Sequence, residues 1–548
     1  MPAAFRGGVH APSAPRLTAQ ANGLVPVSEA RTKLRVGVVL PSAQVPAWQA
    51  SLLQSLIEWE DADVVLWTLG GSNDGPAQAN PIYRAFRRVE DRLPHDVPDA
   101  LAPHPVMALV DGICGLAGPA GVRARDLDVL LALTGLEELS KAGIFARYGL
   151  WYFEAGDRAL DPADGSMAGF HEVLCRNPGL SGSLRIRLER ERRDLIAVST
   201  HSAVNPRSHF LTRNEHLWKC SSFVVRALRA SREAGPTAYL DSLPAAPIPT
   251  TARFRPSLSL AFGRYVLWRV RKLLEHRVWS ERWILLWSDE SREPASGKFR
   301  PLQPPAGRFW ADPHVIEVDG TQHIFFEDAS RDSWKGHIAH LSRAKDGTFS
   351  ATTPVIERPY HLSYPFVFAW QGEYFMIPES AENQTVELYR CKRFPDKWEF
   401  VHNMMEGIRA FDATLVEHGG RWWMFANVSG REGTSSWDEL CIFHSDSPLS
   451  REWRAHSANP VVSDVRSARP AGRFFRDGAD LIRPSQDSSG HYGRALVFNR
   501  VLELSEKRYR ELPVKTVEAD WDKSVLGIHS YSCANAFTVI DAIRRELQ

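Results

Sequence analysis

The sequence predicts a multi-domain chain, an α/β domain followed by an all-β five-bladed propeller. Strand-like and helix-like segments alternate in the first third, helix signals nearly vanish after Trp283, and a segment of about 50 residues then repeats. At 548 residues, length alone allows three or four domains of ordinary size. The repeat reduces this to two large units. The predicted parts are a disordered tail (1–32), the α/β domain (33–235), a linker with an amphipathic helix (236–282) and the propeller (283–548).

The α/β domain is predicted from the order of its elements. A buried-strand pattern at 34–41 precedes an amphipathic stretch at 48–60, and further strand patterns follow at 64–70 and 127–135. Strands that alternate with helices predict a parallel sheet with helices on both faces. No Gly-x-Gly-x-x-Gly follows Leu40, so no dinucleotide is expected. We predict no cofactor for either domain.

The net charge and the cysteine spacing exclude some classes of partner and indicate where in the cell the protein lies. The net charge of +1 gives no field to hold a polyanion, so nucleic acid is not an expected partner. The six cysteines show no Cys-x-x-Cys spacing, which argues against disulfides or a zinc site and fits a reducing cytosol. The tail has no apolar signal-peptide core, and no run of 18 uncharged apolar residues occurs. We therefore expect a cytoplasmic protein.

Residues 258–279 form a basic amphipathic helix candidate with two interpretations. Trp268, Val270, Leu273 and Leu274, with Arg and Lys beside them, are typical of a helix that lies on a membrane surface. Most amphipathic helices instead cover a protein core, so we favour a connecting helix packed between the domains. The membrane alternative would place the protein at the inner face of the membrane. The oligomeric state is not predicted.

Polar residues recur in the repeat with the same spacings of 52 and then 48: Asp312, Tyr364 and Asp412 at one position, and Glu327, Glu379 and Asn427 at another. The three clear copies are 310–330, 363–382 and 411–430, the weaker ones are 469–504 and 527–541, and the strand predicted to close the ring beside the last copy is 283–290. A period near 50 with several short strands per unit is typical of a propeller blade. The 18 Trp residues are then explained mainly as packing between blades.

Three carboxylates are the catalytic candidates of the propeller. The ends of the inner strands converge on a central funnel, so Asp312, Glu379 and Asp412 are predicted to meet there. Glycosidic-bond cleavage needs such a set, with an acid for the leaving oxygen and a base for water. The alternative is that these residues cap strand ends through local hydrogen bonds. No metal is required by this mechanism.

The segments FWADPHVI, IFFED, YPFVF, YFMIPES, FDATL and WWMFAN resemble the five-bladed propellers of glycoside hydrolase family 43. With RPAGRFFRDGADLIRPSQDSSGHYG, the chain is more similar still to the propeller domain of the glucosamine inositolphosphorylceramide transferases. The first resemblance implies an inverting mechanism with Asp312 as base, Asp412 as tuning carboxylate and Glu379 as acid. The carboxylates here follow the order Asp, Glu, Asp rather than Asp, Asp, Glu, and Tyr364 stands where the family has Asp. A transferase or a lectin-like role therefore remains open.

Further funnel residues are expected to bind the substrate, a glycan or nucleotide sugar. Arginines beside carboxylates suit an anionic or phosphorylated glycan, although ordinary ion pairs are the alternative for each. The candidates are Trp310, Tyr364, Arg409, Arg469, Arg483, Gln486 and His529.

The segments YGLWYFEAGD, GFHEVL and SGSLRIRLERERRDLIAVS resemble the Rossmann-like formyltransferase fold of methionyl-tRNA and sugar-nucleotide formyltransferases. That family uses an Asn-x-His pair and a later Asp. Here Tyr152 and Glu154 stand at the Asn and His positions, and Asp194 alone keeps its identity. Tyr offers no amide donor, so we expect a degenerate site that does not transfer formyl groups by the usual mechanism.

Three functions follow from these observations. The first is a carbohydrate-active enzyme of surface-glycan synthesis or tailoring, a glycoside hydrolase or glycosyltransferase, that acts at the funnel carboxylates. The second is a non-catalytic glycan-binding or scaffold protein with both sites eroded. The third keeps formyl transfer to an amino sugar in the first domain, with Glu154 in an altered role.

Overall fold

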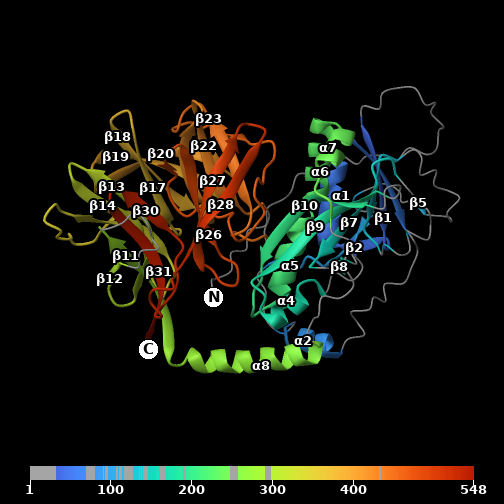
Figure 1. Cartoon of the computed structure of the whole chain (residues 1–548), viewed down its shortest axis with the longest axis horizontal. Coiled ribbons are helices and arrows are strands. Elements are labelled where there is room, and N and C mark those ends of the chain that lie inside the picture. Colours follow the sequence, from blue (N-terminus) through green and yellow to red (C-terminus); the bar gives the residue numbers. More distant parts are fainter. Residues whose placement is uncertain are drawn as a thin grey trace.

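The structure is a computed structural model that describes residues 33–547, with its longest gaps at 69–80, 116–126, 140–145, 161–166, 247–256 and 290–297. Figure 1 shows two bodies, joined along one edge by the long helix α8 (Leu258–Glu275). The first body is a sheet with helices, and the second is a β-propeller. The tail predicted at 1–32 lies outside the described residues.

Eight strands form one mixed sheet in the first body, in the order β10-β9-β7-β6-β1-β3-β5 with β8 beside β7. Parallel pairing joins β1 (Leu34–Leu40), β3 (Ala62–Thr68), β5 (Cys114–Gly115), β6 (Val129–Ala132) and β7 (Leu150–Ala155). Antiparallel pairing adds β8 (Arg158–Ala159), β9 (Gly179–Leu188) and β10 (Arg193–Ala203). A separate ladder joins β2 (Gln44–Pro46) to β4 (Pro103–Pro105).

Helices bury one face of this sheet. Trp48, Leu217 and Phe223 are fully buried against strand residues such as Val38 and Phe153, because each helix turns an apolar stripe toward the apolar face of the strands. These helices are α1 (Ala47–Ile57), α5 (His209–Cys220) and α6 (Phe223–Ala234). The structure also describes α2 (Pro81–Glu90), α4 (Phe170–Cys175) and α7 (Pro236–Ser242) in the first body.

The sequence patterns located some of these elements and missed others. Strands β1, β3 and β6 and helix α1 lie where the patterns predicted them. The Pro- and Ala-rich stretch predicted as linker begins instead with α7, since Pro236 occupies the first turn of a helix, where its missing N–H is not needed. The Rossmann-like class and the relation to formyltransferases stay predictions.

The second body confirms the predicted five-bladed propeller. Four blades have four strands each: β13–β16 (Arg308–Val318, Thr321–Ser330, Gly336–Arg343, Thr353–Ile356), β17–β20 (Ser363–Trp370, Glu373–Ser380, Thr385–Arg393, Lys397–Glu406), β21–β24 (Ala410–His418, Arg421–Val428, Leu440–Ser445, Arg454–Ala455) and β25–β28 (Phe475–Asp477, Asp480–Asp487, Ala495–Leu504, Tyr509–Glu518). The fifth combines β11 (Trp279–Ser288), β12 (Arg300–Leu302), β29 (Val525–Gly527), β30 (Tyr531–Ala534) and β31 (Phe537–Leu547).

The fifth blade closes the ring with strands from both ends of the propeller. Strand β11 pairs antiparallel with β31 from Trp279 opposite Leu547 to Ser288 opposite Thr538. This pairing confirms the prediction that a strand before the first repeat lies beside the last one. The ring is therefore closed by hydrogen bonds within the fifth blade, between strands from the two ends of the propeller segment.

The two bodies contact each other through buried polar groups. Lys219 of α5 forms an ion pair with Asp438 of the propeller, and both side chains are 1% exposed. Lys219 also donates to the hydroxyls of Thr200 and Ser202 at 3.1 and 3.0 Å. A backbone bridge joins His201 to Asp464. Among the described residues, no helix is both long and apolar enough to cross a membrane.

Candidate functional site

The first repeated position has the same unusual backbone in three blades. Asp312, Tyr364 and Asp412 have φ angles of 52°, 40° and 55°, although none is glycine. In each case the register of the first two strands of the blade shifts at this residue. Such bulges redirect a side chain, and strained non-glycine residues cluster at functional sites. The equivalence read from the spacing therefore has a structural counterpart.

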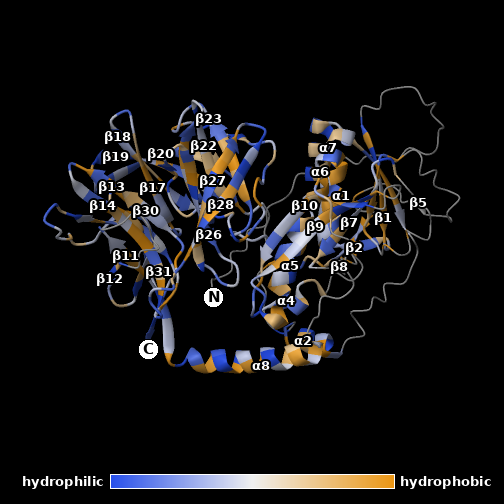
Figure 2. Cartoon of the chain, viewed as in Figure 1, coloured by the Kyte–Doolittle hydropathy of each residue, from blue (hydrophilic) through white to orange (hydrophobic). Residues whose placement is uncertain are grey.

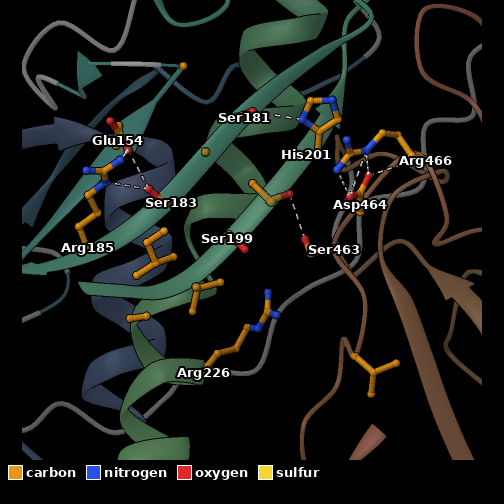
Figure 3. Close-up of a pocket in the computed structure, with 17 residues that line it drawn as sticks. Glu154, Ser181, Ser183, Arg185, Ser199, His201, Arg226, Ser463, Asp464 and Arg466 are labelled. Atoms are coloured by element: carbon orange, nitrogen blue, oxygen red, sulfur yellow. Dashed lines mark hydrogen bonds and ion pairs between the residues drawn. The ribbon is translucent and has the colours of Figure 1, made fainter. Parts of the chain in front are cut away.

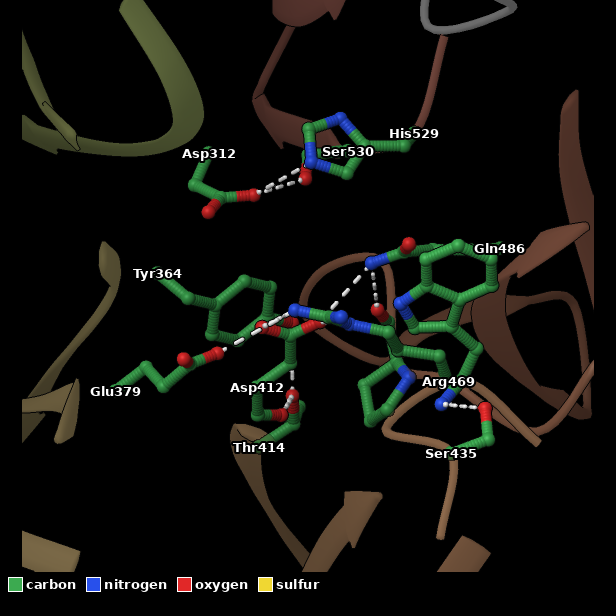
Figure 4. Close-up of polar contacts among 12 residues, drawn as sticks. Asp312, Tyr364, Glu379, Asp412, Thr414, Ser435, Arg469, Gln486, His529 and Ser530 are labelled. Atoms are coloured by element: carbon green, nitrogen blue, oxygen red, sulfur yellow. Dashed lines mark hydrogen bonds and ion pairs between the residues drawn. The ribbon is translucent and has the colours of Figure 1, made fainter. Parts of the chain in front are cut away.

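Asp312 lies in a buried chain of polar groups (Figure 4). Its Oδ1 lies 3.2 Å from Nε2 of His529 and accepts a 2.8 Å hydrogen bond from the hydroxyl of Ser530. Nδ1 of His529 lies 2.8 Å from Oδ1 of Asp541. Asp541 also accepts the backbone N–H of Asp312 at 2.8 Å. Residues of the fifth blade, His529, Ser530 and Asp541, thus hold the Asp312 carboxylate of the first blade in place.

These contacts set the charges of the Asp312 group. Burial lowers the pKa of His529, but Asp541 and Asp312 outweigh burial and raise it from 6.5 to about 10. Burial raises the pKa of Asp312, but the charge and hydrogen bonds of His529, with Ser530, more than offset it and hold the pKa below the usual 3.8. Near neutral pH His529 is therefore protonated and Asp312 is ionised.

Asp412 and Glu379 share one arginine (Figure 4). Nε of Arg469 donates to Asp412 at 2.5 Å, and its Nη2 donates to Asp412 at 3.2 Å and to Glu379 at 3.4 Å. Gln486 adds a 2.9 Å hydrogen bond from Nε2 to Asp412. Tyr364 is within 2.8 Å of the hydroxyl of Thr414, which in turn donates to the backbone carbonyl of Asp412 at 3.0 Å.

Two glutamates of the cluster favour the protonated form. Burial raises the pKa of Glu379 well above the usual 4.5, and the charge of Asp412 raises it further, against the lowering effect of Arg469. Burial and the charge of Asp312 do the same to Glu327. Glu327 was not among the predicted site residues, although its register with Glu379 was the signal for it. The cluster therefore pairs an ionised Asp312 with neutral carboxylic acids.

Asn427, which is equivalent in the repeat to Glu327 and Glu379, differs from them in its hydrogen bonding. Asn427 is fully buried, and neither atom of its side-chain amide has a hydrogen-bond partner among the described residues. Oε1 of Gln486, also buried, has none either. Buried polar groups are normally paired, so such atoms are the ones that a polar ligand would satisfy.

Asp312, His529 and Asp541 also offer three ligand atoms that lie within 4.8 Å of one another, close enough to hold a metal ion. A metal needs a neutral imidazole, whereas the two carboxylates hold a proton on His529. A metal-bound His529 and a protonated His529 therefore exclude each other. In the protonated state the imidazolium balances the charge of Asp312 and Asp541.

Two predicted binding residues have other surroundings, and a third borders the cluster. Arg483 donates to Glu511 at 2.8 and 2.7 Å, so its charge is satisfied within its own blade. Trp310 packs on Phe326 with ring centroids 4.9 Å apart, in a core shared by the first and fifth blades. Arg409 lies over the ring of Phe411 at 6.0 Å, and Arg469 of the cluster lies over the same ring at 5.5 Å. The cluster therefore gathers Tyr364, Arg469, Gln486 and His529 from the predicted binding set, together with the three predicted carboxylates.

The predicted formyltransferase positions are occupied by mutually satisfied groups. The hydroxyl of Tyr152 donates to Asp194 at 2.7 Å, and Arg187 donates to the same carboxylate at 3.0 and 3.1 Å. Burial and Asp194 raise the pKa of Tyr152 to about 12. Glu154 forms an ion pair with Arg185 and accepts a 3.1 Å hydrogen bond from Ser183. These pairs stabilise the polar face of the sheet.

Glu154 also lines a polar cavity of about 600 Å³ between the two bodies (Figure 3). One wall is the β9–β10 pair, and the other is the propeller segment 461–466. Its charges are matched locally, because Arg466 is paired with Asp464 at 2.6 Å as Arg185 is with Glu154. Most of its remaining polar lining consists of hydroxyl groups, those of Ser181, Ser183, Ser199, Thr200 and Ser463.

Comparison with known proteins places the likeness in the propeller. A family model described as glucosamine inositolphosphorylceramide transferase 1, N-terminal, matches residues 303–536. The protein named glucosamine inositolphosphorylceramide transferase 1 of Oryza sativa subsp. japonica is 35% identical over 210 residues, which cover 38% of this chain and 28% of that protein. The Arabidopsis thaliana protein of the same name is 34% identical over 209 residues, 38% of this chain and 27% of its own. The chain thus spans less than a third of the length of these relatives.

Solved structures similar to this chain include glycoside hydrolases. A family 117 enzyme of Zobellia galactanivorans has a TM-score of 0.32 and 10% identity, and covers 49% of this chain and 91% of its own. A thermostable family-43 enzyme has a TM-score of 0.30 and 13% identity over 38% of this chain and 76% of its own. The family 32 β-fructofuranosidase of Bombyx mori has a TM-score of 0.33 and 13% identity, and the match covers 45% of this chain and 60% of that enzyme.

The predicted resemblance to the transferase propeller is confirmed over 303–536. That match includes no residue of the first body, so the formyltransferase resemblance stays a prediction. The cytoplasmic location also stays a prediction.

Proposed function

We propose that the propeller funnel binds a sugar and carries acid–base chemistry at its glycosidic bond, by cleavage or by transfer. One observation carries the proposal: the surroundings give two funnel carboxylates opposite protonation states. Asp312 is held ionised by His529, and Glu379 is held neutral by burial and by Asp412. A pair of carboxyl groups whose pKa values are pushed apart is what an acid and a base at one bond require.

Each carboxylate then has a role that its contacts support. Asp312 accepts the proton of the attacking water or acceptor hydroxyl. Glu379 gives its proton to the leaving oxygen, so the number of protons is unchanged over the reaction. Asp412 is held by Arg469 and Gln486, and its charge raises the pKa of Glu379.

Two further observations support a sugar as the ligand. Asn427 and Gln486 bring buried amide atoms that have no partner among the described residues, and amides are good partners for sugar hydroxyls. The matched relatives are named as transferases of glucosamine and inositolphosphorylceramide, so we propose an amino sugar or the sugar headgroup of a glycolipid. The proposal is limited to this sugar-handling step, since the chain spans only 28% of the first relative.

Arg469 favours a second candidate, a funnel that binds a glycan without reacting. Its guanidinium neutralises Asp412 and reaches Glu379, and both carboxylates are buried. In that case the cluster is a rigid polar network whose carboxylates accept hydrogen bonds from the hydroxyl groups of the glycan.

The Glu379→Gln variant separates the two candidates, because Gln keeps the shape of the acid but has no proton to give. We expect it to abolish hydrolysis of 4-nitrophenyl glycosides, tested first with the glucosaminide, and to retain sugar binding in calorimetry. The control is Asp328→Asn, which removes a buried carboxylate of the neighbouring blade that pairs with Arg308 instead. If the wild type binds sugar and cleaves none of the glycosides, glycan binding is the function. Full turnover in Glu379→Gln would refute the assigned acid.

A further inference from the structure

Helix α8 exposes apolar side chains along the face that points away from the molecule. Leu267 is 74% exposed, Leu273 64% and Leu274 58%. Their neighbours Leu260, Val266, Val270 and Val278 are also among the exposed large hydrophobic residues. A solvent-facing helix surface is normally polar, so this stripe is unusual.

The inner face of α8 accounts for only part of its apolar content. Ala261 and Tyr265 are buried, and Phe262 and Trp268 pack beside them on the core that contains Phe170. At about 100° per residue, the exposed leucines lie on the side of the helix opposite these residues. Figures 1 and 2 show α8 along one edge of the molecule, and no described element lies on its outer side.

Basic residues flank the stripe. Between 258 and 278 the sequence has five Arg or Lys and one acidic residue, Glu275. Arg264 and Arg271 are exposed beside the leucines, and Arg277 follows the end of the helix. An exposed apolar stripe edged by cations matches a surface that combines acyl chains with anionic headgroups.

We propose that α8 is a membrane-surface anchor, which lies in the plane of an anionic lipid bilayer and buries Leu267, Val270 and Leu274 among the lipid chains. The 18-residue helix is about 27 Å long, so both bodies are held beside the membrane. The uncovered outer face of α8 thereby favours the membrane-surface helix over a helix that only connects the two bodies.

A second copy of the chain fits this surface less well. Two such helices packed face to face would bring the Arg264 and Arg271 rows together, and like charges at a contact oppose association. Lipid headgroups of opposite charge turn the same residues into a favourable contribution.

The test is sedimentation of the full chain with vesicles. We expect binding to vesicles of phosphatidylglycerol and phosphatidylcholine in equal parts, and much weaker binding to phosphatidylcholine alone or at raised ionic strength. The Leu267→Glu/Leu274→Glu double variant should lower the partition coefficient at least tenfold, since each leucine withdrawn from lipid is worth about that factor. Arg264→Gln/Arg277→Gln should weaken binding to the anionic vesicles only.

The matched control is Leu512→Glu/Val514→Glu, which changes two exposed apolar residues on β28, away from α8. It should bind vesicles like the wild type. Equal binding by the α8 double variant and the wild type, or no binding of the wild type to anionic vesicles, would overturn the proposal. Loss of a dimer in light scattering without any vesicle binding would instead identify α8 as a contact between copies. Glycoside turnover is measured separately, so failure here leaves the proposed function untouched.

Discussion

His529 links the first and last blades at the scale of single residues. It lies between Asp312 and Asp541, and the imidazolium balances two carboxylates that would otherwise repel each other in a buried site. Both His529 and Asp541 lie in the weak repeat copy 527–541, but only His529 is among the predicted funnel residues. The contact of these two residues with Asp312 could not be predicted, because it depends on which strand ends meet after the ring has closed.

The raised pKa of His529 predicts a pH-dependent contribution to stability. Its folded pKa of about 10 exceeds the ordinary 6.5, so the folded state binds the proton more tightly than the unfolded state. The stabilisation is complete below pH 6.5 and is lost as pH rises toward 10. The difference in unfolding free energy between wild type and His529→Gln should be largest at pH 6.5 and shrink toward pH 10, as measured by urea denaturation. A difference that grows with pH would contradict this assignment.

Asp312 and Glu379 should respond differently to removal of their charge. Asp312→Asn leaves His529 with one carboxylate partner fewer and should cost about 3 kcal/mol, the usual size for a broken buried ion pair. Glu379→Gln resembles the neutral acid already present and should cost less than about 1 kcal/mol at neutral pH. Both values are measured by chemical denaturation. Equal costs would mean that Glu379 is ionised in the folded protein.

At the scale of elements, the repeat carried most of what could be predicted. The spacings of 52 and 48 located the bulges at Asp312, Tyr364 and Asp412, because each bulge sits at a fixed place in its blade. Arg483 shows the limit of that reasoning. A residue near an inner strand can pair within its own blade, as Arg483 does with Glu511, and the sequence does not distinguish that outcome from a place in the funnel.

The strands that close the ring should be indispensable. The matched family range 303–536 omits both β11 and β31. A fragment of residues 303–536 lacks the fifth blade's longest pair, so we expect it to unfold without cooperativity. A fragment of residues 279–547 should unfold in a single cooperative transition by calorimetry. Cooperative unfolding of the shorter fragment would show that four blades suffice.

At the scale of the whole molecule, the arrangement of the two bodies could not be predicted. Lys219 and Asp438 are 219 positions apart, and neither belongs to a motif that points to the other. Their contact depends on the path of the chain through α8 and on the surfaces of two finished folds. The basic and apolar residues of α8, in contrast, were visible in the sequence, but which of them stay exposed depends on how the helix packs.

The Lys219–Asp438 pair should hold the two bodies together. Lys219→Met leaves Asp438 buried without its partner and should destabilise the contact by about 3 kcal/mol. The expected result is faster proteolysis between the bodies and a larger radius of gyration in solution scattering. Adding Asp438→Leu should recover much of the loss, because two apolar groups satisfy each other. A double variant no more compact than the single one would argue that other contacts dominate.

The segment 461–469 connects the two candidate regions. Val461, Ser463, Asp464 and Arg466 line the cavity between the two bodies, and Arg469 donates hydrogen bonds to Asp412 and Glu379. Any molecule that moved Asp464 or Ser463 would act on the carboxylates through this short stretch of backbone. Thermodynamic linkage then requires the reverse, since a sugar in the funnel would change the affinity of the cavity by the same free energy. The cavity between the two bodies and the funnel of the propeller would thus be coupled through the backbone between Asp464 and Arg469.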